Sequence, residues 1–235
     1  METWPDDVWE FTLPAIEISL SEKDRHIIGS ATPFFADAFD LPGRMPDALE
    51  CAPALSTAIE DLAETGAFLR LGSASFKRPG ALSMPVETFD QALDTIRAPN
   101  VRAAKFVGDS LVNDYPLSLF AFPWHPVQNW AEFRMFVREG ALVGVSQYHC
   151  DTNFQILHPL LPEASTKIAA FWEKLAPTLP LDDVIADVFI DTDGTNLFDV
   201  HLIELNPFIR RSDSCLFSWV REGDFDGSFR VVTAT

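Results

Sequence analysis

The sequence predicts an α+β fold with two lobes. Apolar segments with the alternating pattern of strands occur in consecutive pairs, and helical segments interrupt these pairs rather than alternate with single strands. This order favours antiparallel sheets over a doubly wound parallel sheet. The 235 residues are enough for two small domains, and a proline- and tryptophan-rich link at residues 123–130 marks a boundary. We therefore expect an N-terminal lobe over residues 1–125 and a C-terminal lobe over residues 126–235.

The expected first lobe begins with an acidic segment. Residues 1–50 contain eleven acidic residues, three basic residues and five prolines, and we expect them to form an irregular extension. A helix is then expected to begin at Ser56, whose hydroxyl can cap it, and to end at Gly66. Residues 67–71 read as a short apolar strand, and Pro85 opens a second amphipathic helix.

From residue 103 onward the pattern turns mainly to strands. Two hairpins are expected, one turning at Glu139-Gly140 and the other at the sequence TDGTN, residues 192–196. A helix is expected between them at residues 163–175. The segments that we expect to be strands are residues 105–109, 116–122, 132–140, 141–150, 184–191 and 197–208.

The composition restricts the classes of function. Thirty-five acidic against 17 basic residues give a formal charge of −18 and a pI near 4.4, which disfavours a broad nucleic-acid-binding surface. The three cysteines lie far apart without a CxxC pattern, which favours a reducing compartment over a disulfide framework. The N-terminal sequence lacks a signal-peptide pattern, and no segment has the roughly 20 apolar residues of a membrane span. We therefore expect a cytoplasmic protein without nucleic-acid or membrane partners.

Three side chains with oxygen donors lie on the second expected hairpin. Glu204 and Asn206 are two residues apart on a strand and therefore share one face. Asp187 interrupts an otherwise apolar strand, where a carboxylate without a partner is costly. If the two strands pair, these groups converge as a set that suits Mg²⁺, with phosphate oxygens and water completing the shell. The alternative is that Asp187 faces solvent and Glu204 pairs with a neighbouring arginine.

A second candidate site is a loop at about residues 68–80. Arg70 lies on the strand that leads into this loop, and Ser73 and Lys77 lie within its run of small and basic residues. Small residues allow backbone N–H groups to approach phosphate oxygens, and the cations neutralise charge. The GxxxxGK[ST] spacing of a P-loop is absent. The alternative is a polar surface loop with a solvated lysine.

Arg134 is the third candidate. In residues 132–136 it shares a strand face with Glu132, and its planar guanidinium can bind a carboxylate or a phosphate through two hydrogen bonds. The alternative is a cross-strand ion pair without further function.

Four segments, taken in order, resemble the cell division cycle 123 family, a divergent branch of the ATP-grasp superfamily. The resemblance implies a two-lobed ATP-grasp fold, with the nucleotide in the cleft between antiparallel sheets. The chain departs from the family pattern in having Glu204 where the family has a metal-binding aspartate, although glutamate still supplies oxygen. The four segments are FLRLGSASFK, EFRMFVREGALVGVSQ, FIDTDGTNLFDVHLIELNPF and SDSCLFSW.

The resemblance also implies a role for each candidate residue. ATP and Mg²⁺ are the implied cofactors, with Arg134 as the catalytic residue that faces the γ-phosphate or the acceptor. The strand at residues 118–124, which includes Phe122, would hold the adenine through its backbone. The implied nucleotide-binding residues are Arg70, Ser73, Lys77, Phe122 and Arg134, and the implied metal ligands are Asp187, Glu204 and Asn206.

Three functions agree with these expectations. The first is an ATP-dependent ligase that acts through a phosphorylated or nucleotidylated intermediate on an unknown small-molecule or protein acceptor. The second is an ATP-dependent assembly factor, the role that the eukaryotic members of the family have for eukaryotic translation initiation factor 2. The third is a nucleotide-binding scaffold without turnover. For all three, Asp187→Asn is expected to weaken Mg-ATP binding while leaving folding intact or improved.

Overall fold

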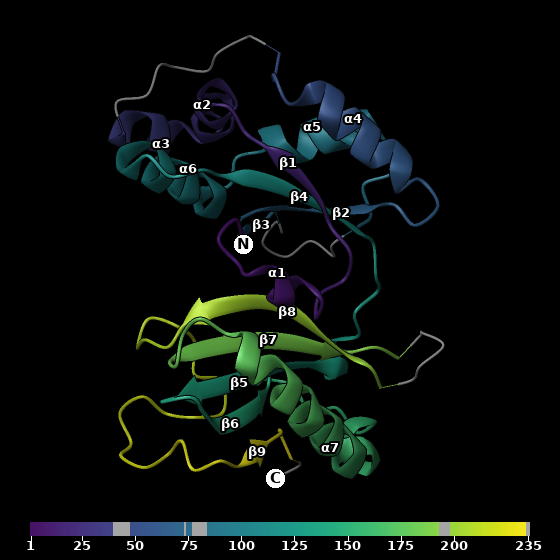
Figure 1. Cartoon of the computed structure of the whole chain (residues 1–235), viewed down its shortest axis with the longest axis vertical. Helices are drawn as coiled ribbons and strands as arrows, with labels where there is room; N and C mark the ends of the chain where they lie inside the picture. The colour runs from purple at the N-terminus through teal and green to yellow at the C-terminus, as the bar shows by residue number, and fades with distance from the viewer. Residues whose placement is uncertain (40–47, 73, 77–83, 193–197, 234–235) are drawn as a thin grey trace. The chain divides into compact units, whose positions relative to one another are not determined.

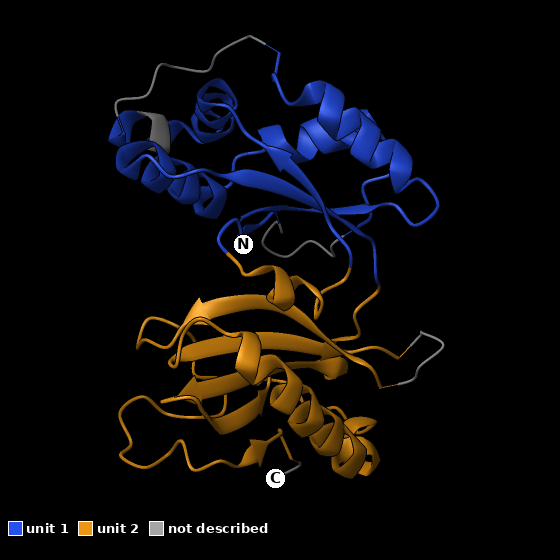
Figure 2. Cartoon of the chain, viewed as in Figure 1, with its two compact units in different colours: residues 1–3, 14–125 blue, residues 4–13, 126–235 orange. Residues whose placement is uncertain are grey.

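The computed structural model divides the chain into two compact units (Figure 2). Unit 1 contains Met1–Thr3 and Pro14–His125, and unit 2 contains Trp4–Leu13 and Pro126–Thr235. The sequence placed residues 4–13 with the first lobe, whereas in the structure Val8 is fully buried in the core of unit 2. Both units combine a sheet with helices, so the predicted α+β class is confirmed. The structure describes residues 1–39, 48–72, 74–76, 84–192 and 198–233.

Unit 1 is a four-stranded antiparallel sheet with helices on one side (Figure 1). The strand order is β1-β4-β2-β3. Alternation along β2 places Leu69 and Leu71 in the core with the helices, and Arg70 on the other face. The strands are β1 (Ile16–Ser19), β2 (Ala67–Leu71), β3 (Ala74–Ser75) and β4 (Ser118–Pro123); the helices are α2 (Glu22–Ser30), α3 (Pro33–Ala38), α4 (Ala52–Asp61), α5 (Phe89–Arg97) and α6 (Val101–Asn113).

Three expectations for the first part of the chain are wrong. Residues 1–50 are not an irregular extension, because they contain α1 (Asp6–Trp9), β1, α2 and α3. Residues 105–109 are not a strand but the middle of α6, which begins where the Asn100 side chain accepts a hydrogen bond from the Ala103 N–H. Helix α4 begins at Ala52 rather than Ser56, with a proline in its first turn.

Unit 2 is a five-stranded sheet covered on one face by α7 (Leu157–Leu175) (Figure 1). The strand order is β8-β7-β5-β6-β9, and every pair is antiparallel except β6 with β9. The strands of both expected hairpins pair antiparallel, and Glu139 and Gly140 make the first turn with positive φ angles of 52° and 71°. Most of the expected second turn, at residues 192–196, lies outside the described residues. The elements are β5 (Glu132–Arg138), β6 (Ala141–Gln147), β7 (Val184–Ile190), β8 (Val200–Pro207), β9 (Phe229–Arg230), and the 3₁₀ turns η1 (Asn129–Ala131) and η2 (Ala176–Thr178).

The two faces of the unit 2 sheet differ in character. On one face, Phe133, Met135 and Val188 pack with residues of α7. On the other face, Phe136 and Ile185 form an aromatic cluster with residues of the segment after β8. The polar side chains singled out from the sequence lie on this second face, because they alternate with the residues that pack on α7. Among the described residues, no helix is both long and apolar enough to cross a membrane.

Candidate functional site

A row of charged residues crosses three neighbouring strands of unit 2. Arg134 on β5 is paired with Asp187 on β7, and Asp187 is paired with Glu204 on β8. Cross-strand partners project to the same face of a sheet, so the three side chains lie side by side. The register shifts at a β-bulge directly after Asp187, next to the charged row.

Arg134 and Asp187 form a buried bidentate ion pair. Nε of Arg134 donates to Oδ1 of Asp187 at 2.6 Å, and Nη2 donates to Oδ2 at 2.7 Å. Nη1 donates to the backbone carbonyl of Asp213 at 2.9 Å, and the guanidinium lies 5.0 Å from the ring centroid of Tyr148. Only 6% of Arg134 and 1% of Asp187 is exposed. All three guanidinium nitrogens therefore have partners within the protein.

Asn206 connects the two carboxylates. Its Nδ2 donates to Oδ2 of Asp187 at 3.1 Å and to Oε1 of Glu204 at 3.0 Å. The spacing of two residues along β8 places Asn206 and Glu204 on the same face, as the sequence pattern indicated. The structure therefore brings together Asp187, Glu204, Asn206 and Arg134.

The electrostatics of this cluster reflect its burial. Removal from water raises the pKa of Asp187, the Arg134 ion pair opposes this rise, and the nearby Glu204 carboxylate adds to it. Burial also raises the pKa of Tyr148 to about 12. The charged row holds two carboxylates but a single guanidinium, so when both carboxylates are ionised the three side chains carry a net negative charge that favours a bound cation.

The oxygen atoms of Asp187, Glu204 and Asn206 fit a hard cation that also binds phosphate oxygens or water. Two carboxylates and a carboxamide offer oxygen atoms of the kind that Mg²⁺ prefers. Asn206 would have to turn its amide so that Oδ1, rather than Nδ2, faces the cation. No cluster of three or more His, Cys, Asp or Glu side chains within the described residues could hold a metal on its own. Phosphate oxygens or water would thus have to supply the remaining ligands.

The alternatives to a binding site are only partly realised. Asp187 does not face solvent, whereas Arg134 does form a cross-strand ion pair, with Asp187 on β7, as its alternative expected. Glu132 lies 3.2 Å from Nε2 of His149. The ion pair changes the expectation for Asp187→Asn: because the buried Arg134 depends on this carboxylate, we now expect the substitution to destabilise the fold.

The nucleotide-binding residues predicted in the first half of the chain lie in unit 1. Arg70, 3% exposed, is paired with Phe120 across β2 and β4, and Phe122 follows two residues later on the same face. Ser73 and Lys77, with much of the expected phosphate loop, lie outside the described residues.

One contributor to the site was not predicted from the sequence. The Asp213 carbonyl accepts a hydrogen bond from Arg134, and this segment is held close to β6 because Cys215 contacts the Tyr148 carbonyl at 3.8 Å. Every residue has a backbone carbonyl, so the residue type at position 213 does not reveal this contact. Local sequence patterns also cannot show that residues 134 and 213 lie close together. The sequence signal that could have indicated this contact is the segment SDSCLFSW, which resembles the family and contains Asp213, although no site residue in it was predicted from the sequence.

The fold and the site together define a protein of two α+β units with a buried carboxylate pair on the sheet face opposite α7. A family model described as D123 matches residues 102–226, more than half of the chain, so the chain belongs to the D123 family. This confirms the resemblance to the cell division cycle 123 family.

Known relatives support the same assignment. The chain is 36% identical over 112 residues to a protein of Candida albicans named translation initiation factor eIF2 assembly protein, a match that covers 46% of this chain and 30% of that protein. It is 39% identical over 98 residues to cell division cycle protein 123 of Eremothecium gossypii, covering 41% of this chain and 26% of that protein. The matched segments thus span about a third or less of these relatives.

A solved structure shares the fold over nearly the whole chain. The structure of Cdc123 from Schizosaccharomyces pombe superposes with a TM-score of 0.72 and 20% sequence identity, covering 99% of this chain and 94% of that chain. At this identity the similarity shows the fold alone.

Proposed function

We propose that this protein binds ATP together with Mg²⁺, and that Asp187, Glu204 and Asn206 hold the cation. The observation that carries the proposal is the buried carboxylate pair bridged by Asn206, with distances of 3.1 and 3.0 Å. Bound Mg²⁺ would neutralise phosphate oxygens that otherwise face two carboxylates. Mg²⁺ is usually held by one or two carboxylates plus substrate phosphates, which is the set this cluster offers.

Arg134 is better suited to hold Asp187 than to contact a phosphate. Its Nε and Nη2 are occupied by Asp187, and its Nη1 by the Asp213 carbonyl. We therefore assign Arg134 as a positioning residue, which fixes the carboxylate that would bind the cation. This changes the catalytic role expected from the sequence. Arg70, Ser73, Lys77 and Phe122 remain predicted nucleotide-binding residues on the grounds of the sequence.

We infer that the bound nucleotide serves the assembly of a protein complex rather than a ligase reaction. The relatives named as eIF2 assembly proteins support this choice and suggest translation initiation factor eIF2 as the partner. The ligase hypothesis assigned Arg134 to the transferring phosphate or the acceptor, and the contacts of Arg134 favour another role.

Isothermal titration calorimetry with ATP, in Mg²⁺ and in EDTA, tests the binding proposal. Binding is expected in Mg²⁺ and is expected to be much weaker in EDTA; equal affinity in both would overturn the cation assignment. Retention of a purified eIF2 subunit on the immobilised protein, with and without Mg-ATP, tests the assembly role. ATP-dependent retention without ADP release supports an assembly factor, whereas ADP release on adding an acceptor supports a ligase.

A further inference from the structure

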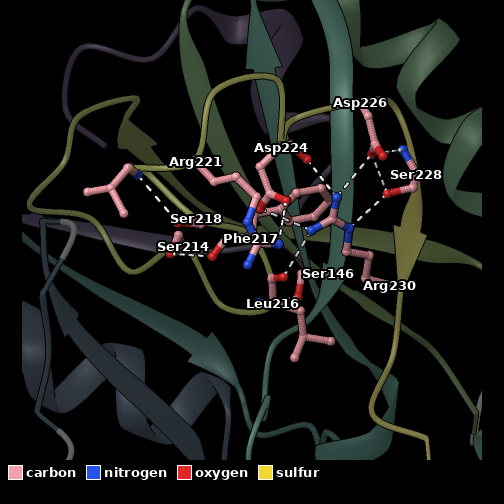
Figure 3. Close-up of polar contacts among 11 residues, drawn as sticks. Ser146, Ser214, Leu216, Phe217, Ser218, Arg221, Asp224, Asp226, Ser228 and Arg230 are labelled. Atoms are coloured by element: carbon pink, nitrogen blue, oxygen red, sulfur yellow. Dashed lines mark hydrogen bonds and ion pairs between the residues drawn. The ribbon is translucent and has the colours of Figure 1, made fainter.

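Arg230 on the short edge strand β9 binds one loop of unit 2 through its whole guanidinium (Figure 3). Nη1 donates to the Leu216 carbonyl and to Oδ2 of Asp224, both at 3.1 Å. Nη2 donates to the Asp224 carbonyl at 2.6 Å and to Oδ1 of Asp226 at 3.2 Å, and Nε donates to Oγ of Ser228 at 2.9 Å. Five hydrogen bonds from one side chain thus hold the segment between residues 216 and 228 against β9.

The same guanidinium also stacks on Phe217, with its carbon 3.9 Å from the ring centroid (Figure 3). Phe217 is 5% exposed and lies parallel to Phe225, at 5.1 Å between centroids and 7° between planes. Its ring lies over Gly144 of β6, where a Cβ atom would come within 2.5 Å of the ring. The position of Phe217 is therefore fixed by Arg230 on one side and by a glycine on the other.

A short series of contacts connects this loop to the carboxylate pair. The Leu216 N–H donates to Oγ of Ser146 at 3.2 Å, and the Cys215 N–H donates to Oδ1 of Asp213 at 2.8 Å. Cys215 has a positive φ of 49°, a tight local conformation that turns the chain between these two contacts. The Asp213 carbonyl then accepts from Nη1 of Arg134. Displacement of residues 213–217 would remove this acceptor from a buried guanidinium.

We infer that Arg230 is a positioning residue for the Asp187–Glu204 site, acting by fixing the loop whose Asp213 carbonyl orients Arg134. The inference rests on the proposed function for its effect on nucleotide binding, but the link from Arg230 to Arg134 is independent of any ligand. Outer partners of metal ligands, such as Arg134, typically change metal affinity by about 10–100-fold when they are removed; Arg230 acts through Arg134, so an effect at the lower end of this range is expected.

The test compares two substitutions of Arg230 with a matched control. Arg230→Met keeps the length of the aliphatic stem and removes the charge and all donors. Arg230→Lys keeps the charge beside Asp224 but lacks the planar group that reaches several acceptors at once. Arg221→Ala is the control, because Arg221 also contacts Asp224, at 3.3 Å, but its side chain is 74% exposed and no hydrogen bond of its side chain reaches residues 213–217.

Two measurements are made on each folded variant. The first is the ¹⁵N NMR signal of the Arg134 Nε–H, identified by its loss in Arg134→Lys, which reports the bond to Asp187 without any ligand. The second is the Mg-ATP affinity by calorimetry. A purely structural role for Arg230 would lower the melting temperature without changing the Arg134 signal.

We expect both Arg230 variants to shift or broaden the Arg134 signal and to weaken Mg-ATP binding by about tenfold, with Arg221→Ala resembling the wild type. An unchanged Arg134 signal and unchanged affinity in a folded Arg230 variant would overturn the inference. If Arg230→Met does not fold, the Arg134 signal and the Mg-ATP affinity of Arg230→Lys decide between these outcomes. If the Arg134 signal responds but the wild type binds no Mg-ATP, the positioning role stands and the proposed function fails.

Discussion

If the proposed function is correct, the Asp187 carboxylate binds two cationic groups, the Arg134 guanidinium and Mg²⁺. In the structure Asp187 is 1% exposed and both oxygens of its carboxylate accept from Arg134, while Oδ2 also accepts from Asn206. Breaking a buried ion pair from one side leaves the other charge without compensation, which costs more than the pair itself contributes. The same side chain is thus expected to affect both stability and ligand binding.

Asp187→Asn is expected to weaken Mg-ATP binding by at least about tenfold, because one anionic ligand of the cation is lost. It is also expected to lower the free energy of unfolding by about 3 kcal/mol, because Arg134 stays buried without its full counter-charge. Thermal melts with and without Mg-ATP measure both effects. Asp191→Asn, four residues further and beyond the end of β7, is the control for binding and should change the Mg-ATP affinity little. A full ligand-induced rise in melting temperature in Asp187→Asn would remove Asp187 from the site.

At the scale of elements, the strands of unit 2 were predictable and several elements of unit 1 were not. Strands β5 to β8 are apolar segments of seven or eight residues, and Glu139-Gly140 gives a clear turn signal between β5 and β6, so strand and turn signals agree. In α6, Ala103, Ala104 and Val107 are buried, a helical spacing that a short apolar run does not distinguish from a strand.

The first 50 residues were mispredicted for a different reason. Their prolines and charges suggest irregular structure, yet β1 is stabilised by long-range pairing with β4. The pairing of β1 with β4 joins segments that are distant in the sequence and is invisible in local composition. Helix α2, by contrast, begins with a local signal, a capping box of Ser21 and Asp24. The carboxylate pair was predictable from spacing, whereas its buried partner Arg134 and the Asp213 carbonyl depend on contacts between distant segments.

Asp24 links two helices of unit 1 and provides a test at this scale. Asp24 is 1% exposed, and its carboxylate accepts from Ser21 at the start of α2. It also accepts from the Glu50 N–H at 2.6 Å and the Cys51 N–H at 3.4 Å, just before α4. Asp24→Ala leaves these buried donors without an acceptor and is expected to cost about 2–3 kcal/mol in the free energy of unfolding. Urea unfolding measures the change.

The control for Asp24 is Glu22, an acidic residue in the same first turn that is more exposed. Glu22→Ala is expected to change the free energy of unfolding by less than about 0.5 kcal/mol. Equal effects from the two substitutions would mean that Asp24 acts only through the helix dipole and not through its hydrogen bonds.

For the whole molecule, the formal charge of −18 is the dominant electrostatic property. Like charges at this density repel one another and destabilise the compact state, and salt screens them over a Debye length of about 10 Å at 0.1 M. The melting temperature is therefore expected to rise when NaCl is increased from about 20 to about 200 mM. A melting temperature that falls with salt would mean that attractive ion pairs outweigh the net repulsion.

The central claim is that Asp187, Glu204 and Asn206 hold the cation of Mg-ATP, and metal-directed cleavage tests it most directly. Fe²⁺ replaces Mg²⁺ in the presence of ATP, and ascorbate with hydrogen peroxide then cuts the backbone close to the bound iron. We expect cuts next to Asp187 and next to residues 204–206, dependent on ATP, suppressed by excess Mg²⁺ and absent in Glu204→Gln. ATP-dependent cuts confined to other segments, such as the acidic residues 1–39, would contradict the account.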